Sequence, residues 1–461
     1  MEKLGNDLAS TENSEKSLLL ASNEKKSSKW GPVSQLIILA VVFMLSNAPV
    51  ASILNLEGIL NPEIGLYGLM CNFGGCTLSL VTSPIISRYA GAKGSVVLGS
   101  MSQIVFIAAH FYVQPYILLP VAFLSGIFFA NGMITSNVYI TALAVDYAKI
   151  TKKPLHHVMG FFNGLFSTIF TTNFIWANLI SSLVLTTEEM DNRTESSEFG
   201  NLSELCGPSF CPWEDVTGTH IREPEQYIVY ILLGSYIGLI CIACCVTLLL
   251  LKNIHPTSGD ALHGARDFCN SVLNLLWKKK LVLIVPLLVT AGLGQEFIAT
   301  EFTKAFVSCV IGVNYNGWSM ICYSAGRSIG NAVIGRLIKF TGLPAMCVFA
   351  TCINSACLAS MLALDPADII IEYHFFVPAA WGVADAVWLT QTMAFIGHTF
   401  PDEKWPAFAA ARTSNYLSST VIYALSNSLC LDAKIYLVFG SVGLSLCSFM
   451  TFILIPKIKR T

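Results

Sequence analysis

The chain has 461 residues, of which 54% are hydrophobic and only 12% are charged, and its formal net charge is -2. This composition leaves too few polar side chains to cover the surface of a soluble protein of that length, so much of the surface must face lipid. The small net charge, with no basic stripe of interleaved aromatic residues, gives no reason to expect a nucleic-acid partner. The composition therefore predicts a membrane protein.

The first 31 residues are rich in Ser, Lys, Glu and Asn and lack an apolar run long enough for a cleaved signal peptide. We expect residues 1–31 to form a disordered cytosolic tail. Glu15, Leu19 and Leu20 fit the acidic dileucine pattern that sorting adaptors read, which would direct some molecules to endosomal or lysosomal membranes. So short a string also arises by chance, and an uninformative tail is the alternative.

Twelve apolar stretches follow, each long enough to cross a hydrocarbon core that needs about 20 helical residues. They are residues 32–54, 66–88, 94–112, 115–141, 158–186, 227–251, 281–300, 316–339, 343–363, 373–399, 406–428 and 433–456. This pattern predicts an all-α polytopic membrane protein with the major facilitator fold, in which twelve transmembrane helices form two six-helix pseudo-repeats. The alternative for the third and fourth stretches is a single re-entrant hairpin.

The spans also define the expected domain organisation. The N-terminal six-helix bundle covers residues 32–251 with an outer loop at 187–226, and the C-terminal bundle covers residues 281–456. Residues 252–280 between them contain an amphipathic stretch that we expect to lie on the cytosolic face. Residues 457–461 form a short cytosolic tail.

Positive charge is distributed asymmetrically between the loops. With a cytosolic N-terminus, the 27 Lys and Arg residues all fall on the cytosolic side except Arg193, Arg222, Lys304 and Lys434 in outer loops and Arg327 and Arg412 within spans. Cytosolic loops of membrane proteins carry an excess of Lys and Arg. The asymmetry predicts that both termini are cytosolic.

The long loop between the fifth and sixth spans has features of an extracellular or luminal segment. Asn192 and Asn201 begin its two Asn-X-Ser/Thr sequons, so we expect glycan on at least one of them. Cys206 and Cys211 are closely spaced there, which predicts a disulfide between them. The remaining cysteines of the 15 in the chain are interpreted as small apolar residues in spans or on the cytosolic side. His220 is the single histidine of the loop, so no metal site is expected.

The loops that close the second span of each pseudo-repeat share a basic pattern, at residues 87–91 and 338–342. These turns resemble the loop motif of the major facilitator superfamily, in which a cation contacts helix ends and helps to hold the inward-closed state. The resemblance implies gating-loop cations at Arg88, Lys93, Arg336 and Lys339. Ser87 and Ile338 stand where that motif has an aspartate, which weakens the comparison.

Several segments are similar to the uncoordinated-93-like family, and to its A-type branch in particular. They are WANLISSL at 176–183, the loop with Cys206 and Cys211, MICYSA at 320–325, WGVADAVWLTQ at 381–391 and AFAAAR at 407–412. The resemblance runs over nearly the whole chain after the tail. It implies a non-enzymatic membrane protein with the major facilitator fold, in a family that includes regulatory partners of two-pore potassium channels and a trafficking chaperone of endosomal receptors.

Among the ionisable residues within predicted spans, four stand out: Glu296, Arg327, Asp385 and Arg412. Such groups usually face the bundle interior, where they form either a substrate or coupling site or structural ion pairs between helices. Arg327 and Asp385 lie at matching depths on spans that we expect to be neighbours. They are therefore predicted to pair or to share a polar network.

Two functions fit these features. The resemblance implies a regulatory or accessory partner of a potassium channel, acting on gating or trafficking, in the plasma membrane. The two-fold repeat and the buried charges favour the alternative, a secondary transporter of a small solute or ion by alternating access. The sequence has no nucleotide-binding loop, zinc-protease motif or nucleophile elbow, so we expect neither enzymatic activity nor a cofactor.

Overall fold

The computed structural model describes residues 30–60, 64–189, 206–213, 226–253, 270, 274–275, 277–366, 368–400 and 404–458. Over these residues every regular element is a helix. The earlier helices are α2 (Trp30–Leu60), α3 (Gly65–Ala109), α4 (Pro115–Thr151), α5 (Leu155–Thr171), α6 (Asn173–Glu189) and α8 (Gln226–Leu250), with the short 3-10 helix η1 (Gly207–Ser209) between the last two. The later ones are α10 (Lys279–Val282), α11 (Val285–Glu296), the π-helix η2 (Phe297–Ser308), α12 (Asn314–Thr341), α13 (Leu343–Ala363), α14 (Tyr373–Thr399), α15 (Lys404–Ser426) and α16 (Leu431–Ile458).

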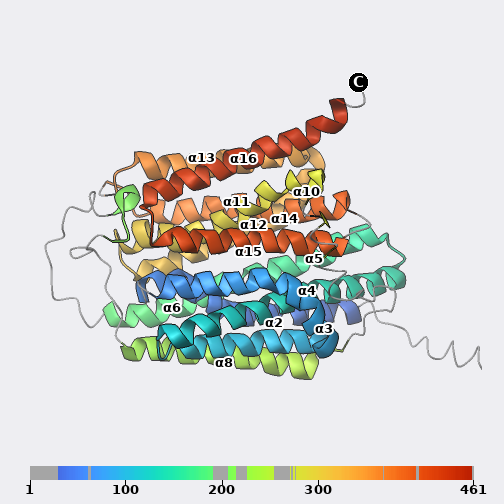
Figure 1. The fold of residues 1–461 in the computed structure, drawn as a ribbon, viewed down its shortest axis with the longest axis horizontal. Helices are drawn as coiled ribbons and strands as arrows, with labels where there is room; N and C mark the ends of the chain where they lie inside the picture. The colour runs from blue at the N-terminus through green and yellow to red at the C-terminus, as the bar shows by residue number, and fades with distance from the viewer. Residues whose placement is uncertain are drawn as a thin grey trace, which may run out of the picture.

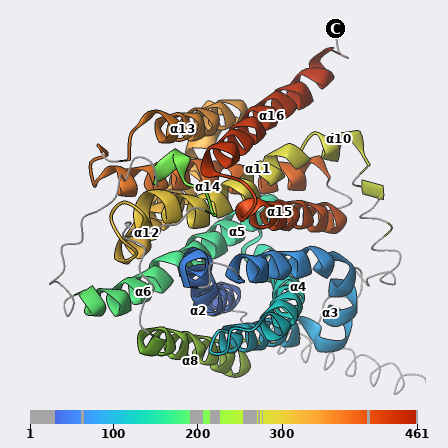
Figure 2. The same cartoon turned by 60° about the vertical axis from the view of Figure 1, so that its left-hand side comes forward.

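The long helices lie side by side with their axes roughly aligned, and they separate by chain order (Figure 1). The N-terminal helices, α2 to α8, occupy one side of the molecule and the C-terminal helices, α11 to α16, the other (Figures 1 and 2). The two sets meet mainly where α3 packs on α15 and where α6 and α5 pack on α12.

Eight helical stretches of the described residues are long and apolar enough to cross a membrane, or nine if the bent pair Gly65–Ser79 and Val81–Ser87 is one span. The protein is thus a multi-pass membrane protein. The helices α12, α14 and α15, which carry Arg327, Asp385 and Arg412, are not among the nine, so apolarity alone does not confirm the predicted total of twelve.

The second and third predicted spans are both found in α3. They are separated at Gly91, where the backbone leaves helical geometry with a φ of 68°. Only glycine adopts this conformation without steric cost, so the glycine of the repeated basic turn is what lets the chain break between two spans. The predicted end of the first span was too early, because α2 continues to Leu60.

Glycines bring two pairs of helices into backbone contact. A methyl group on Gly126 of α4 would overlap the Asn72 carbonyl oxygen of α3. In the C-terminal helices, a methyl group on Gly326 of α12 would overlap the Ala379 carbonyl of α14, and Gly382 meets the Tyr323 carbonyl in the same way. Small residues at such contacts let membrane helices approach closely, and here they place the side chains next to Gly326 and Gly382 within reach of one another.

The predicted disulfide between Cys206 and Cys211 is wrong, although both residues are disulfide-bonded. Cys206 is bonded to Cys309 and Cys211 to Cys430, with Cα–Cα distances of 5.7 and 4.2 Å. Cys309 directly follows η2, and Cys430 directly precedes α16. Both therefore lie at one end of the C-terminal helices, which we call the disulfide end.

Residues 206–213, the cap segment, dock on this disulfide end. The Leu431 amide donates a hydrogen bond to the Phe210 carbonyl oxygen at 2.9 Å. Gly207, with a φ of 69°, lies so close to Pro366 that a methyl group would overlap its ring. The cap segment thus contacts three connections of the C-terminal helices, which explains why its cysteines bond to distant partners and not to each other.

We expect disulfide mapping to reproduce this pattern. Proteolysis without reduction, with cleavage between the two cap cysteines after Phe210, should give peptides that join Cys206 to Cys309 and Cys211 to Cys430 by mass spectrometry. In a Cys309→Ser variant, Cys206 should become alkylatable while the second bond persists. A peptide closed between Cys206 and Cys211 in the unmodified protein would contradict the arrangement.

Candidate functional site: a buried ionic network

Arg327 and Asp385 form an ion pair in the interior of the C-terminal helices, as the sequence predicted. Arg327 Nε lies 3.2 Å from Asp385 Oδ2, and the two side chains are only 6% and 3% exposed. The contact is possible because Gly326 and Gly382 hold α12 and α14 in backbone contact. Each charge therefore offsets much of the cost of burying the other.

Hydrogen bonds extend this pair into a network of neutral groups. The Tyr323 hydroxyl donates to Asp385 Oδ2 at 2.7 Å. Arg327 Nη1 donates to Tyr323 Oη at 3.3 Å and to Gln295 Oε1 at 3.1 Å. Tyr323 thus contacts both members of the ion pair, and Gln295 joins the pair to α11 through Arg327.

The network continues to a second carboxyl group on α11. Gln295 Nε2 donates to Glu296 Oε1 at 3.2 Å, and the Tyr423 hydroxyl of α15 lies 2.6 Å from Glu296 Oε2. Ser419 approaches Oε1 more distantly, at 3.5 Å. A continuous chain of polar contacts therefore crosses α14, α12, α11 and α15.

Aromatic rings of the N-terminal helices contact two tyrosines of this polar network. Phe174 of α6 contacts the Tyr323 ring edge to face, with centroids 6.0 Å apart. Phe73 of α3 stacks on Tyr423 at 5.5 Å. The network consequently lies where the two sets of helices meet, and separating them would uncover both tyrosines.

A second buried ion pair lies nearer the disulfide end. Lys434 Nζ is 2.7 Å from Glu301 Oε2 and donates to the Ser426 carbonyl at 2.7 Å, while the Ser426 hydroxyl bonds Glu301 Oε1. Glu301 belongs to the π-helix η2. π-Helical geometry is rare in proteins, and where it occurs it is often at a functional site. This pair was not predicted, because Lys434 was assigned to an outer loop and Glu301 directly follows the predicted span 281–300.

A third pair joins Glu57 of α2 to His110, which follows α3, with 3.2 Å between Oε2 and Nε2. This pair was not predicted from the sequence. His110 was inside a predicted span and could have been noticed, whereas Glu57 was lost because the first span was ended too early.

The other predicted site residues are not in this network. Arg412 is half-buried on α15, and no bond between described residues links it to Glu296 or Asp385. Lys93 donates to the Leu248 carbonyl near the C-terminal end of α8 at 2.8 Å, where a cation is electrostatically favourable. The side chains of Arg88, Arg336 and Lys339 lie outside the described residues, as do Asn192, Asn201, Glu15, Leu19 and Leu20.

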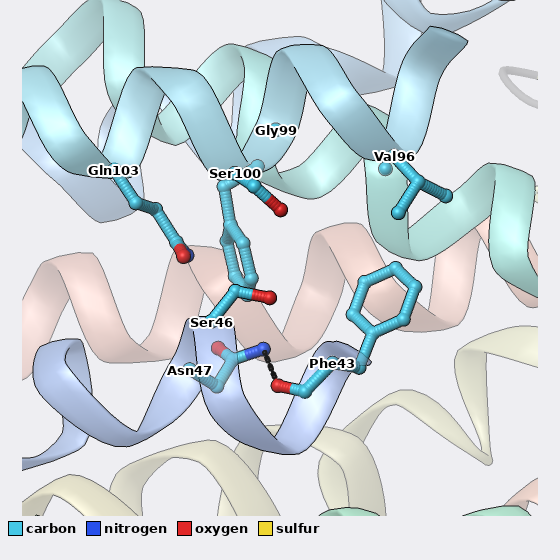
Figure 3. Close-up of a pocket in the computed structure, with 9 residues that line it drawn as sticks. Phe43, Ser46, Asn47, Val96, Gly99, Ser100 and Gln103 are labelled. Atoms are coloured by element: carbon cyan, nitrogen blue, oxygen red, sulfur yellow. Dashed lines mark hydrogen bonds between the residues drawn. The ribbon is translucent and has the colours of Figure 1, made fainter. Parts of the chain in front are cut away.

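A narrow cavity opens inside the N-terminal helices, away from the ionic network (Figure 3). Its polar lining includes Gln103, Ser100 and Asn47, and the Asn47 amide is tied back to the Phe43 carbonyl at 3.1 Å. Among the described residues, no group of three His, Cys, Asp or Glu side chains could hold a metal ion.

The fold and the buried charges define a multi-pass helical membrane protein, and solved structures share its architecture. The chain is similar to a mutant form of the nucleoside transporter NupG, with a TM-score of 0.64 and 12% identity over 91% of this chain and 99% of the other. It is also similar to the E. coli fucose:proton symporter FucP, with a TM-score of 0.57 and 11% identity over the same shares. These are major facilitator proteins, so the predicted all-α major facilitator fold is confirmed, without the count of twelve spans.

The chain belongs to the UNC-93 family, described as "Ion channel regulatory protein UNC-93", whose pattern matches residues 57–453. It is 28% identical to Protein unc-93 homolog A of Xenopus laevis over 88% of this chain and 89% of that protein. It is 24% identical to the "Putative potassium channel regulatory protein unc-93" of Caenorhabditis elegans over 91% of this chain and 60% of that protein.

We expect Asp385→Asn to destabilise the protein, because Arg327 is left buried without its counter-ion. Such losses cost about 3 to 5 kcal/mol, so a thermal melt of detergent-solubilised protein should show less folded material and an earlier transition. Adding Arg327→Gln should restore part of the stability. Asp368→Asn, at an exposed carboxylate between α13 and α14, is the matched control and should change little. A double variant no more stable than Asp385→Asn alone would contradict the pairing.

Proposed function

We propose that this protein is a non-enzymatic regulatory partner of a potassium channel. The main observation in support is the match to the ion channel regulatory family over residues 57–453. The name of the C. elegans relative, a putative potassium channel regulatory protein, supports the choice of channel. The partner would meet this protein within the bilayer.

The surface of the helices is suited to contacts in the membrane. Large apolar side chains are exposed along α8, including Ile231, Ile242 and Leu249. Meanwhile the ionic network is closed, since Glu296, Arg327 and Asp385 are all at least nine-tenths buried. A closed interior with an apolar outer face favours a protein that acts through its surface.

A second candidate is a secondary transporter of a small solute or ion. The similarity to NupG and FucP, together with buried charges where the two sets of helices meet, favours it. In this alternative the sets would separate to open a path, and the network around Arg327 would face the solute. Residues 32–251 and 281–456 would then be the two moving domains.

Recordings with and without this protein would distinguish the candidates. A potassium channel that co-purifies with this protein from native membranes would first be identified. We expect co-expression of the two proteins to change the channel current or the number of channels at the cell surface. The Asp385→Asn, Arg327→Gln double variant, if it reaches the membrane, should keep this effect because a regulator needs the fold and not the charges. Asp368→Asn serves as the control variant. Unchanged currents, together with solute uptake that the double variant abolishes, would contradict the regulator and favour the transporter.

We further propose that the disulfide end faces the cell exterior or an organelle lumen and that both termini are cytosolic. Disulfides form in oxidising compartments, which agrees with the distribution of Lys and Arg. The plasma membrane is the proposed site, with endosomal or lysosomal membranes reached through Glu15, Leu19 and Leu20.

This topology and destination can be tested in intact cells. An epitope at the N-terminus should be protected from external protease, and peptide N-glycosidase should shift the mobility of the protein through Asn192 or Asn201. Replacing Leu19 and Leu20 by alanine should raise the biotinylated surface fraction, whereas replacing the neighbouring Leu18 should not. Cleavage of the N-terminal epitope from outside would overturn the orientation, and an unchanged surface fraction would remove the sorting role.

A further inference from the structure

The buried carboxyl groups of the described residues divide unequally between charged and neutral partners. Four acidic side chains are buried, Glu57, Glu296, Glu301 and Asp385. Three of them lie within 3.2 Å of a basic side chain: Glu57 of His110, Glu301 of Lys434 and Asp385 of Arg327. Glu296 is the exception, because its hydrogen-bond neighbours are Tyr423, Gln295 and Ser419, all of them neutral.

Arg327 does not supply the missing charge. Its guanidinium is paired with Asp385 and reaches Glu296 only through the intervening amide of Gln295. Two carboxyl groups thus share one cation at a site that is almost fully buried within the membrane-spanning helices. A buried carboxylate without a cation is so costly that such groups neutralise instead.

We propose that Glu296 is a proton-binding site, held as a neutral carboxylic acid while the two sets of helices are closed around it. This inference does not depend on whether the protein regulates a channel or carries a solute. The ligand is a single proton, exchanged with water. The protonated Glu296 side chain is then neutral, as is the neighbouring Arg327–Asp385 pair as a whole.

The contacts assign the proton to one oxygen. Oε1 faces the Gln295 amide nitrogen, and the orientation of this amide is fixed because its oxygen accepts from Arg327. Oε1 is therefore the carbonyl oxygen, and the proton resides on Oε2, 2.6 Å from the Tyr423 hydroxyl. The Tyr423 hydroxyl, which donates to this oxygen in the carboxylate form, accepts from the acid when the proton is bound. When the O–H bond of Glu296 breaks, the proton passes to water, both bonding electrons stay on the carboxylate, and the Tyr423 hydroxyl donates to Oε2 instead.

An alkali cation fits this position less well than a proton. Such an ion requires several oxygen ligands at short distance, as hard cations do. One of the three neighbours of Glu296 presents an amide nitrogen with its hydrogens, and Ser419 is at 3.5 Å. The site offers an amide donor and two hydroxyls, one of which can accept from the acid, and not a shell of acceptors.

Titratable groups face Glu296 from each packed element. They are Tyr423 of α15, Tyr323 and Arg327 of α12 and the Cys76 thiol of α3, while Asp385 of α14 and Glu301 of η2 lie one neighbour further away, beside Arg327 and Tyr423. With Arg327 and Asp385 cancelling each other, and Glu301 held by Lys434, loss of the Glu296 proton leaves one net negative charge. Because Tyr423 stacks on Phe73, that charge appears at the contact between the two sets of helices and favours water entry there.

Infrared spectroscopy of the purified full chain in an ester-free detergent tests the proposal directly. We expect the unmodified protein at neutral pH to show the carbonyl stretch of a protonated carboxyl group, and Glu296→Gln to lose the signal of one such group. Glu301→Gln is the matched control, since that carboxylate is ion-paired, and it should leave the signal unchanged. In Tyr423→Phe, which keeps the ring against Phe73, the band should shift to higher frequency because the carboxyl loses its hydrogen-bond partner.

Two results would overturn the proposal. One is the absence of a protonated-carboxyl signal at neutral and mildly acidic pH, or the persistence of the full signal in Glu296→Gln. The other is a band that appears only when sodium and potassium are replaced by a large organic cation, which would mean that Glu296 holds an alkali ion. If Glu296→Gln does not fold, the Tyr423→Phe shift decides the question, and an unshifted band counts against Glu296.

Discussion

The ion pair between Arg327 and Asp385 depends on the close approach of α12 and α14. Gly326 and Gly382 permit this approach, because any larger residue would collide with the backbone of the facing helix. The resulting contact places a guanidinium and a carboxylate together where neither could remain charged alone. The guanidinium then binds Tyr323 and Gln295, and Gln295 continues the polar contacts to Glu296, so a network across four helices includes one glycine-mediated contact.

The disulfide end constrains the same helices from outside. The cap segment joins the connection after η2 to the connection before α16 through Cys206 and Cys211. Glu301 and Lys434, which lie on these two elements, form their ion pair beneath it, and Lys304 lies 5.4 Å from the Phe210 ring. The covalent bonds and the ion pair therefore hold η2 and α16 in one arrangement, and they do so in a region whose π-helical geometry departs from an ordinary span.

The sequence was sufficient for the class of protein and the fold, and matching depths, together with the helix order of the major facilitator superfamily, were sufficient for the Arg327–Asp385 pair. It failed where a residue lay near a span boundary. Glu57 and Lys434 were assigned to loops, and their buried partners His110 and Glu301 were missed with them. A shift of one helical turn decides whether a charge is counted as solvated or buried.

The disulfides show a different limit. Cys309 and Cys430 were interpreted as apolar residues even though the predicted spans themselves left both in outer loops. Consistent use of those boundaries would have grouped them with Cys206 and Cys211. The choice among the three possible pairings would still have required the packing of the cap segment against the ends of η2 and α16.

The contact between the two sets of helices is chemically asymmetric. The C-terminal helices bring the charges, through Glu296, Arg327 and Asp385, whereas the N-terminal helices meet the tyrosines of the network with the rings of Phe73 and Phe174. A transporter cycle would have to break both aromatic contacts in every turnover, and a regulator would be served by keeping them. In either case the energy of separating the sets depends on the charge state of the C-terminal helices, because the two phenylalanine rings that meet the tyrosines add no titratable group. Control by protonation at this contact must therefore originate on α11 and α15, where Glu296 and Tyr423 meet.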